Sequence, residues 1–312
     1  MRKLVLAAAI SALMSGSALA ENIGVSMALF DDNFLTVLRK AIQDSAAKQN
    51  VKLQIEDAQN DVGKQLNQIQ NFAAAKVDAI IVNPVDTDAT AAMSKAAADA
   101  GIPLVFVNRM PVNLEKLPSN QAFVGSNEAE SGTLETKEIC RALKDKGKKE
   151  ARIVVMMGEL SNQAARQRTK DIEDVIATPD CSFMKIVEKQ AANWSRTQAA
   201  DLMTNWLSAG LKFDAFIPNN DEMAIGGIGS IKTAGLSTKE ILVGGIDGTK
   251  DGLAAMQAGD LAVTVFQNAA GQGQGAVETA LKLAKGSKVD STVWVPFELV
   301  TPANLKNFLS KN

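Results

Sequence analysis

Short apolar runs and longer helical patterns alternate along the whole chain. Runs such as 79–82 (Ala-Ile-Ile-Val) are continuous rather than alternating, which is typical of parallel strands covered on both faces. Each run precedes a segment with apolar residues at helical spacing, such as 33–48 after the run 23–27. The order of strands and helices predicts an α/β fold.

The pattern predicts two consecutive series of such units. Strands are expected at 23–27, 51–56, 79–82, 104–107, 122–125, 153–157, 184–188, 215–217, 241–245 and 262–266. Helices are expected at 33–48, 64–75, 89–100, 131–146, 164–176, 198–209, 223–234, 249–258 and 269–285, with a terminal helix from Ala303. We therefore predict two doubly wound parallel-sheet domains with a cleft between them.

The composition narrows the function. The chain has 312 residues, 46% of them hydrophobic, and its formal net charge is -2. Nothing in this balance favours nucleic acid or an anionic membrane surface as a partner. Histidine is absent, which excludes Ser-His-Asp and Cys-His catalysis and removes the most common metal ligand. We expect no enzyme activity, no cofactor and no metal site.

The first twenty residues have the features of a secretory signal peptide. Two basic residues precede the apolar run 4–14, which is too short to cross a bilayer, and 18–20 has the small-x-small pattern of a cleavage site. We expect cleavage after Ala20 and export of a soluble chain. In an oxidising compartment Cys140 and Cys181 could form a disulfide or stay as two buried thiols, and we favour the disulfide.

Polar side chains recur just past the carboxyl ends of the predicted strands, where parallel α/β sheets bind ligands. Planar polar groups pair with hydroxyls, and flat rings cover the C–H face of a sugar or cyclic polyol. The side chains at these positions are Asp31, Asp32, Asn33, Phe34, Asn108, Arg109, Glu159, Asn162, Arg166, Arg168, Asn193, Trp194, Asn219, Asn220, Asp221, Asp247 and Gln267. The set predicts a polyol-binding cleft, with the loop 31–34 as one wall.

Each of these residues also has a plain structural explanation. Asn and Asp at strand ends are more often helix caps. We expect Asp221 to be a cap, and Asp31 and Asn33 to shape the first loop and cap its helix. Arg166 could be a solvated charge, and Trp194 could belong to the core. The recurrence at loop after loop is what favours a ligand site.

With these motifs the chain resembles the bacterial periplasmic sugar-binding proteins of the ribose and galactose/glucose type, which supply ATP-binding-cassette (ABC) importers. The resemblance rests on 31–34 with 39–42, 59–61, 82–86, 219–221 and 245–247. It implies a three-crossing hinge near Gly125, 267–268 and 295–297. It divides the chain into the signal peptide 1–20, an N-terminal lobe of 21–125 plus 269–296, and a C-terminal lobe of 126–268 plus 297–312.

The resemblance also implies which residues bind ligand. Carboxylates would accept hydroxyl protons, guanidinium groups would donate, and Phe34 and Trp194 would sandwich the ring from opposite sides. The full set that we expect to bind ligand is Asp32, Phe34, Asn108, Arg109, Asn162, Arg168, Trp194, Asn220, Asp247 and Gln267.

Some positions depart from the galactose/glucose type. Asn162 and Ala164 stand where that type has a histidine and an aspartate. The basic segment 144–149 stands where it has a calcium loop, and its oxygen ligands are too few to hold calcium. Arg109 and Gln267 resemble the ribose type instead. The mixture resembles the inositol- and rhizopine-binding branch of the family.

We therefore expect a periplasmic substrate-binding component of an ABC importer, which captures a monosaccharide or cyclic polyol by closure of two lobes. The best match is myo-inositol or a related inositol. Expected partners are this small molecule and a membrane permease, with a chemoreceptor as a further candidate, and we expect a monomer. The alternatives are a ribose- or galactose/glucose-type binding protein and an exported carbohydrate-modifying enzyme. A sugar-responsive repressor would need a helix-turn-helix where this chain has a signal peptide.

Overall fold

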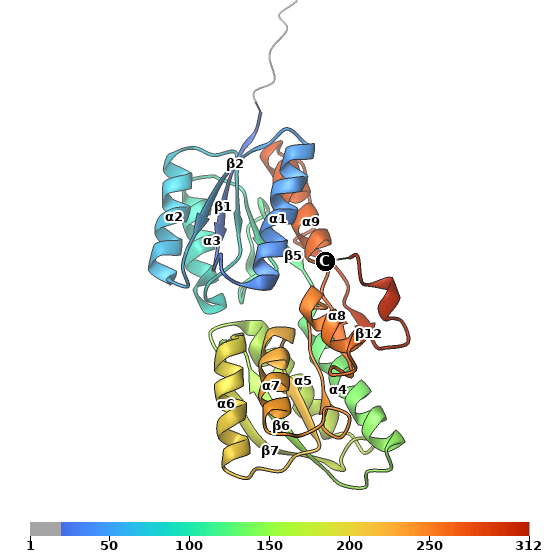
Figure 1. Cartoon of the computed structure of the whole chain (residues 1–312). Helices are drawn as coiled ribbons and strands as arrows, with labels where there is room; N and C mark the ends of the chain where they lie inside the picture. Colours follow the sequence, from blue (N-terminus) through green and yellow to red (C-terminus); the bar gives the residue numbers. More distant parts are fainter. Residues whose placement is uncertain (1–19, 312) are drawn as a thin grey trace, which may run out of the picture.

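Two helix-covered parallel sheets lie one above the other in Figure 1, which shows the computed structural model. The structure describes residues 20–311, so residues 1–19 of the predicted signal peptide lie outside the described residues. The alternating strands and helices confirm the predicted α/β class with two parallel sheets.

The first lobe is the six-stranded sheet with the helices packed on it. Its strand order is β11-β5-β4-β3-β1-β2, and all neighbours are parallel. The strands are β1 (Asn22–Met27), β2 (Lys52–Asp57), β3 (Ala79–Val82), β4 (Leu104–Val107), β5 (Gln121–Gly125) and β11 (Thr292–Trp294). The helices are α1 (Asn33–Lys48), α2 (Val62–Ala74), α3 (Thr90–Asp99) and α9 (Ala269–Ala284), with 3₁₀ helices η1 (Thr87–Ala89) and η2 (Leu114–Lys116).

Strand β3 shows why the apolar runs are continuous. Ile80 and Val82 belong to the core on one face, together with Phe72 of α2. Ala79 and Ile81 belong to the core on the other face, against α1 and α9. All four strand residues are fully buried because helices cover both faces of the sheet.

The second lobe is the four-stranded sheet with its helices. Its strand order is β7-β6-β8-β9, again parallel, and α4 packs on α5 as α6 packs on α7. The strands are β6 (Ala151–Met157), β7 (Met184–Ala191), β8 (Ala215–Pro218) and β9 (Leu242–Val243). The helices are α4 (Glu128–Asp145), α5 (Gln163–Ile176), α6 (Arg196–Ser208), α7 (Asp221–Thr233) and α8 (Lys250–Gln257).

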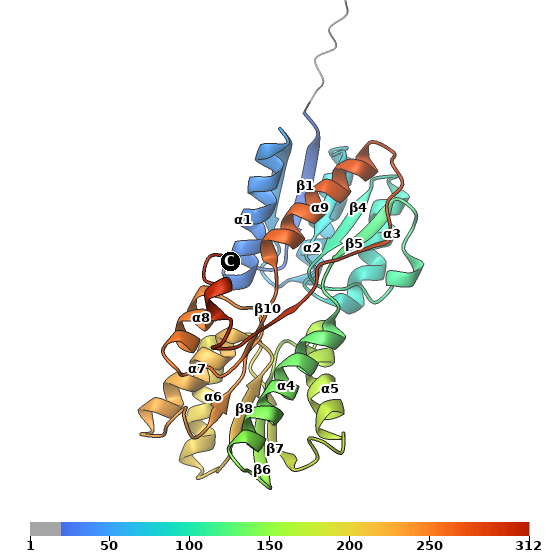
Figure 2. The ribbon, with the colours of Figure 1, turned by 90° about the vertical axis from the view of Figure 1, so that its right-hand side faces the viewer.

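The chain passes between the lobes three times, as Figure 2 shows. It runs from β5 into α4, from β10 (Thr264–Phe266) into α9, and from β11 into β12 (Glu298–Val300). Strand β11 pairs with β5 of the first lobe, whereas β12 pairs antiparallel with β10. The three segments form the hinge expected for this class of fold.

Three of the differences between the predicted and the observed elements have a clear physical cause. The terminal helix expected from Ala303 is only a 3₁₀ helix, η3 (Leu305–Asn307), since a short helix is marginal unless tertiary packing supports it. The strand expected at 241–245 is observed only as the shorter strand β9. The last two residues of the expected range are glycines packed against buried acidic side chains, and we attribute the difference to them. Helix α4 begins at Glu128 rather than at Ser131, because the side chain of Asn127 caps it.

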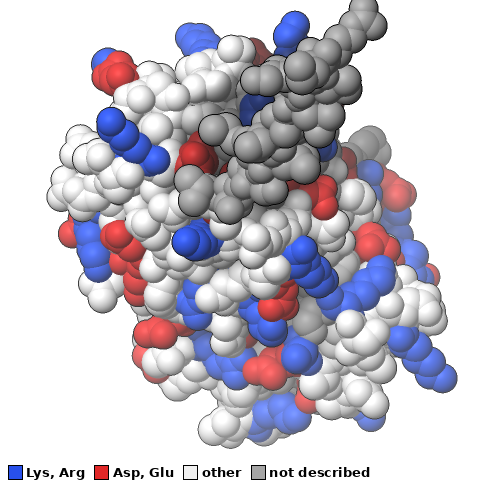
Figure 3. Space-filling view, turned by 90° about the horizontal axis from the view of Figure 1, so that it is seen from above, with Lys and Arg blue, Asp and Glu red and all other residues white. Residues whose placement is uncertain are grey.

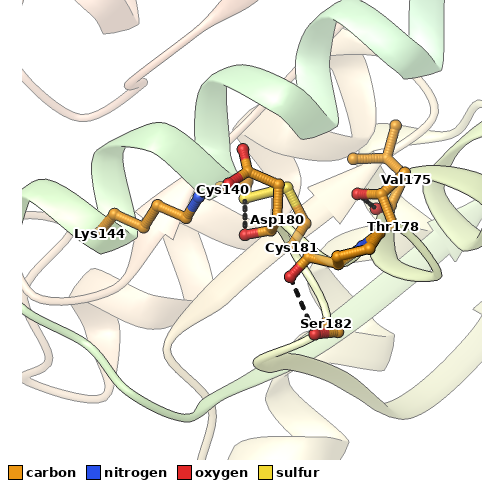
Figure 4. The surroundings of a disulfide bond; sticks show 8 residues. Cys140, Lys144, Val175, Thr178, Asp180, Cys181 and Ser182 are labelled. Carbon is orange, nitrogen blue, oxygen red and sulfur yellow. Dashed lines mark hydrogen bonds and ion pairs between the residues drawn. A yellow bond between two sulfur atoms is a disulfide. The ribbon is translucent and has the colours of Figure 1, made fainter.

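A disulfide joins Cys140 of α4 to Cys181 in the loop before β7 (Figure 4). The S–S distance is 2.12 Å, and the bond closes a separation of 41 residues. Beside it, Lys144 forms an ion pair with Asp180 at 2.5 Å. Of the two arrangements that the sequence left open, the structure has the disulfide.

Charges of both signs are interspersed on the face seen in Figure 3. No large area of one sign stands out on that face, in keeping with the near-neutral net charge. Among the described residues, no helix is both long and apolar enough to span a bilayer.

Candidate ligand-binding site

A cavity lies between the two lobes, at the carboxyl ends of strands from both sheets. It encloses about 400 Å³ of space between atoms, counted with its opening to solvent. The residues that line it are Asp32, Phe34, Leu35, Asn108, Arg109, Glu128, Asn162, Ala164, Arg168, Trp194, Asn220, Asp247 and Gln267. All ten residues that the sequence predicted to bind ligand are therefore brought together in one place.

Three of the lining residues were missed by sequence reasoning. Leu35 and Ala164 add apolar side chains to the cavity lining from the first turns of α1 and α5. Glu128 is the more important omission, because it is buried and charged. It follows the carboxyl end of β5, so the strand-end rule could have found it if α4 had been predicted to begin three residues earlier.

Asp32, in the first loop, lines the cavity and also caps helix α1. Its Oδ1 accepts a hydrogen bond from the backbone N–H of Leu35 at 2.7 Å, which caps α1. The expectation that Asp31 and Asn33 cap this helix is wrong, since Asp32 has the extended backbone that a cap requires. Burial raises the pKa of Asp32, and the bond from Leu35 and the charge of Arg109 oppose the rise.

Asn108 and Arg109 follow β4 and are held mainly by neutral groups. Asn108 has a positive φ of 67°, and its amide bonds to the amides of Asn83 and Gln272, both at 3.2 Å. One guanidinium nitrogen of Arg109 donates to the carbonyl oxygens of Pro84 and Val85, at 3.0 and 3.3 Å. Both side chains are nearly fully buried.

Arg168 is the central cation of the second-lobe half. Its guanidinium donates to both carboxylate oxygens of Glu128, at 2.8 and 3.1 Å, and to the carbonyl oxygen of Asn219 at 2.8 Å. Asp247 lies 3.7 Å from the same guanidinium. Burial lowers the pKa of Arg168, but the neighbouring carboxylates outweigh burial and raise it, so the residue stays charged.

Asp247 and Gln267 meet where β10 leads into the second crossing. Asp247 has a φ of 119°, a strained value for a residue with a side chain, and forms a bridge to Phe266. Burial raises the pKa of Asp247 well above its ordinary value, although the charge of Arg168 opposes the rise. Gln267 is buried, and its amide oxygen accepts from Arg168 at 3.5 Å.

Phe34 and Trp194 supply the flat apolar surfaces of the cavity. Phe34 comes from the first turn of α1 and is only 8% exposed. Trp194 follows β7, has a positive φ of 63°, and packs against Gly158 so closely that any Cβ there would clash with the indole. The Arg168 guanidinium lies 5.6 Å from the indole. A stack of both rings on one ligand stays a prediction.

Asn162 and Asn220 are helix caps as well as cavity residues. Asn162 accepts from the N–H of Ala164 at 3.0 Å, and Asn220 accepts from the N–H of Met223 at 3.0 Å. The expectation that Asp221 caps α7 is wrong, because it is the first residue inside the helix. A cap role and a ligand role are compatible, since one oxygen faces the helix while the amide nitrogen stays available for a ligand.

Two further acids lie buried in the second lobe behind the cavity. Asp221 accepts hydrogen bonds from the N–H of Thr249 at 2.8 Å and from the hydroxyls of Thr249 and Thr264. Burial raises the pKa of Asp221 to about 7. Glu135 of α4 is fully buried, and burial raises its pKa well above the ordinary value. Arg168 is thus a cation among several buried acids.

The lobes touch directly at the edge of the cavity. Glu159 of the second lobe accepts from the amide of Asn60 at 2.9 Å and pairs with Arg109 at 3.4 Å. The N–H of Thr87 donates to the carbonyl oxygen of Ser161 at 3.1 Å. Arg166, which could have been a solvated charge, pairs with Asp88 across the cleft at 2.9 Å. Among the described residues, no group of three acids, cysteines or histidines is arranged to hold a metal ion.

The comparisons with known proteins agree with this geometry. Residues 23–288 match the family model of the periplasmic binding protein domain. A proposed rhizopine-binding protein of Rhizobium meliloti is 62% identical over the full length of both chains. The ribose import binding protein of Bacillus subtilis is 31% identical, covering 92% of this chain and 89% of that one.

Solved structures of similar fold belong to the same class of binding protein. An ABC transporter solute-binding protein of Bacillus halodurans, solved with bound myo-inositol, has a TM-score of 0.88 and 37% identity, over 96% of this chain and 100% of that one. The Caulobacter myo-inositol-binding protein has a TM-score of 0.82 and 27% identity, over 92% and 95% of the two chains.

The chain therefore belongs to the periplasmic binding proteins, the substrate-binding components of ABC importers that bind sugars and polyols. Within that family, the match to the rhizopine-binding relative and to inositol-bound structures confirms the predicted likeness to the inositol and rhizopine branch. Members of this family bind and deliver small molecules without chemical change, so the protein is not an enzyme.

Proposed function

We propose that this protein captures myo-inositol or a closely related inositol in the periplasm and delivers it to a membrane permease. The observation that carries the proposal is the cavity between the lobes, which is lined by Asp32, Asn108, Arg168, Asp247 and their neighbours. Its lining combines amides, carboxylates and guanidinium groups with two aromatic rings, Phe34 and Trp194. A cyclic polyol has hydroxyls around its rim and C–H groups on its faces, so it matches this distribution.

Capture would proceed by closure of two lobes, 21–125 plus 269–296 and 126–268 plus 297–312, around the bound ring. The contacts of Glu159 with Asn60 and Arg109 span the two lobes and support this division. Signal-peptide cleavage after Ala20 would release the mature chain into the periplasm. We further propose that the protein acts as a monomer and has no nucleic-acid partner. Besides the permease, we propose a chemoreceptor as a second protein that binds the closed form.

Inositol is favoured over the alternatives by two of the relatives. One solved relative at 37% identity holds myo-inositol, and the relative at 62% identity is a proposed rhizopine-binding protein. Ribose remains the second candidate, because the ribose import binding protein of Bacillus subtilis is 31% identical. Small displacements of the same polar side chains decide which arrangement of hydroxyls binds. The kinds of side chain that line the cavity therefore suit both ligands.

A thermal-shift screen of the mature protein would test the proposal. The panel would contain myo-inositol, scyllo-inositol, ribose, galactose and glucose, followed by calorimetry on each ligand that raises the melting temperature. We expect the inositols to give the largest shifts, because a ligand bound only by the folded state stabilises it by mass action. Tighter binding of ribose or a hexose would replace inositol with that sugar, and no response to any ring polyol would overturn the proposal.

A further inference from the structure

The C-terminal segment, residues 301–311, packs on the second lobe outside the ligand cavity. It contains the 3₁₀ helix η3 followed by a turn, and it lies beside α8 (Figures 1 and 2). Its side chains Leu305 and Phe308 belong to the core of the second lobe. None of these described residues is among those that line the cavity. The segment can therefore act on the ligand only through other residues.

Phe308 packs on Phe266, the last residue of β10. The centroids of the two phenyl rings lie 5.3 Å apart, with an angle of 56° between the planes, and both side chains are buried. The ammonium group of Lys311 lies 4.2 Å from the centroid of Phe308 and 5.1 Å from that of Phe266. Lys311 also pairs at 3.0 Å with Glu298, which is the β12 partner of Phe266. The segment thus contacts Phe266 through a phenyl ring and through a cation that is itself held in place.

Phe266 lies directly beside two of the predicted ligand residues. The N–H of Asp247 donates to the carbonyl oxygen of Val265 at 2.8 Å, and the N–H of Gln267 donates to the carbonyl oxygen of Asp247 at 3.0 Å. The backbone of Asp247 is therefore bonded to the residues on both sides of Phe266. The phenyl ring of Phe266 also lies against Gly248, where an added Cβ would come within 2.9 Å of it. A shift of Phe266 would therefore move the backbone that carries Asp247.

Asp247 depends on such support because its backbone is strained. Its φ of 119° lies where residues with a side chain are rarely found, and such a conformation persists only where the surrounding structure enforces it. The neighbouring Gly248 has a φ of 65°, which glycine adopts readily. The contacts of Phe266 with this turn are thus part of what keeps Asp247 in the cavity lining.

We infer that Phe308 is a positioning residue for the ligand site, and that it acts by holding Phe266 in place. Through this contact the C-terminal segment keeps Asp247 and Gln267 in the arrangement that binds the ligand. The inference deepens the proposed function and rests on it, because both residues must be ligand contacts. Affinity then depends on a side chain that does not line the cavity.

Calorimetry on the mature protein tests the inference with a matched pair of variants, Phe308→Ala and Phe213→Ala. Phe213 is buried in the same core, but it lies just before β8, at the end of that strand away from the cavity. Each variant removes one buried phenyl ring from the second lobe, so both should lower the melting temperature. At a temperature where both are folded, Phe308→Ala should bind the best ligand of the screen at least about tenfold more weakly than the wild type. Phe213→Ala should change that affinity less than about twofold.

Leucine variants keep the comparison open if an alanine variant does not fold. Phe308→Leu retains an apolar contact with Phe266, so it should weaken the ligand only about threefold. Phe213→Leu should leave the affinity unchanged. Wild-type affinity in Phe308→Leu, where Phe308→Ala does not fold, would overturn the inference.

Hydrogen exchange without ligand measures the positioning directly. Segments 245–249 and 264–268 contain the amides that bond Asp247 to the strand. They should exchange at least about fivefold faster in Phe308→Ala than in the wild type, because local opening becomes easier when packing is lost. The same segments should exchange at the wild-type rate in Phe213→Ala.

The outcomes separate the positioning role from a purely structural one. Wild-type affinity in Phe308→Ala, or equal weakening by Phe213→Ala, would overturn the inference, since loss of core packing would then explain every effect. Faster exchange without weaker binding would also overturn it, because the ligand would not depend on this support. If no ring polyol binds the wild type, the proposed function itself fails, and the exchange comparison still decides whether Phe308 supports Asp247.

Discussion

The two halves of the cavity hold their polar side chains by different means. In the first lobe, Arg109 donates to backbone carbonyls and Asn108 bonds to two amides, so these partners are mostly neutral. In the second lobe, Arg168 is packed among carboxylates that include Glu128 and Asp247. The polar side chains of both halves are largely shielded from solvent, but the second half has more buried charges close to one another.

This difference predicts where the protein is sensitive. A hydrogen bond to a backbone carbonyl survives the loss of one neighbour, because the carbonyl is fixed by its own strand or loop. A buried carboxylate that loses its paired cation is left uncompensated, which costs far more than the pair contributed. The second half should therefore be more sensitive to the loss of its cation, Arg168, than the first half is to the loss of Arg109.

The largest expected effect comes from Arg168→Ala compared with Arg109→Ala. Removing Arg168 leaves the buried carboxylate of Glu128 without its paired cation, and should lower the free energy of unfolding by about 3–5 kcal/mol. Removing Arg109 breaks its hydrogen bonds to two backbone carbonyls and its longer ion pair with the partly buried Glu159, and should cost about 1–2 kcal/mol. Urea denaturation of both variants without ligand measures the difference. Equal losses would mean that the two halves do not differ in the way proposed.

Asp247→Ala should have the next largest effect, on affinity rather than on stability. Hydrogen bonds from ligand hydroxyls to a carboxyl are expected to contribute about 1.5–3 kcal/mol, so affinity should fall about 10- to 100-fold or more. The fold should survive, because burial already disfavours the charged form of this side chain. Calorimetry measures the loss, with exposed Asp174→Ala as control. An unchanged affinity would remove Asp247 from the site.

Most of the fold could be predicted from the sequence, because its signals are local. The continuous apolar run of β3 and the helical spacing of α1 define those elements to the residue. The C-terminal segment failed for the opposite reason: Leu305 and Phe308 are apolar because they pack on the second lobe, and not because they lie on a helix. Periodicity cannot separate these two causes in so short a segment.

The site was predictable only as a set of strand-end residues. The strand-end rule brought together side chains such as Asn162 and Asn220, although they are distant in sequence. It could not reveal that Asp32 caps its helix, or that Glu128 is the partner of Arg168, since such pairings depend on tertiary distances. The hydrogen bond between Asn60 and Glu159 could not be predicted for the same reason, because it exists only when the two lobes are in contact.

Asp221→Asn should change how stability depends on pH. The pKa of Asp221 is raised to about 7 in the folded state by burial, so between pH 4 and 7 the folded chain binds a proton that the unfolded chain has released. Its stabilising contribution is complete below pH 4 and is lost as the pH rises toward 7, at up to about 1.4 kcal/mol per pH unit. The variant lacks this loss, so its free energy of unfolding should fall less steeply.

Asp260 supplies the contrast for that experiment. A hydrogen bond from Lys232 lowers the pKa of Asp260, so its contribution to stability is complete above its ordinary pKa and is lost only as the pH falls further. Asp260→Asn should therefore keep the wild-type slope between pH 4 and 7 in urea denaturation. A wild-type slope in Asp221→Asn would mean that this carboxyl is ionised throughout the range.

The smallest expected effect belongs to the contacts between the two halves. Glu159→Gln keeps an acceptor for Asn60 but removes the charge that faces Arg109, and the pair is partly exposed. Exposed ion pairs contribute about 0.2–1 kcal/mol, so ligand affinity should fall by up to about fivefold, and less in high salt, if this contact forms only on closure. Lys40→Gln removes a pair with Asp44 inside α1 and should leave affinity unchanged. An equal response of the two variants would show that Glu159 stabilises one lobe rather than the contact between them.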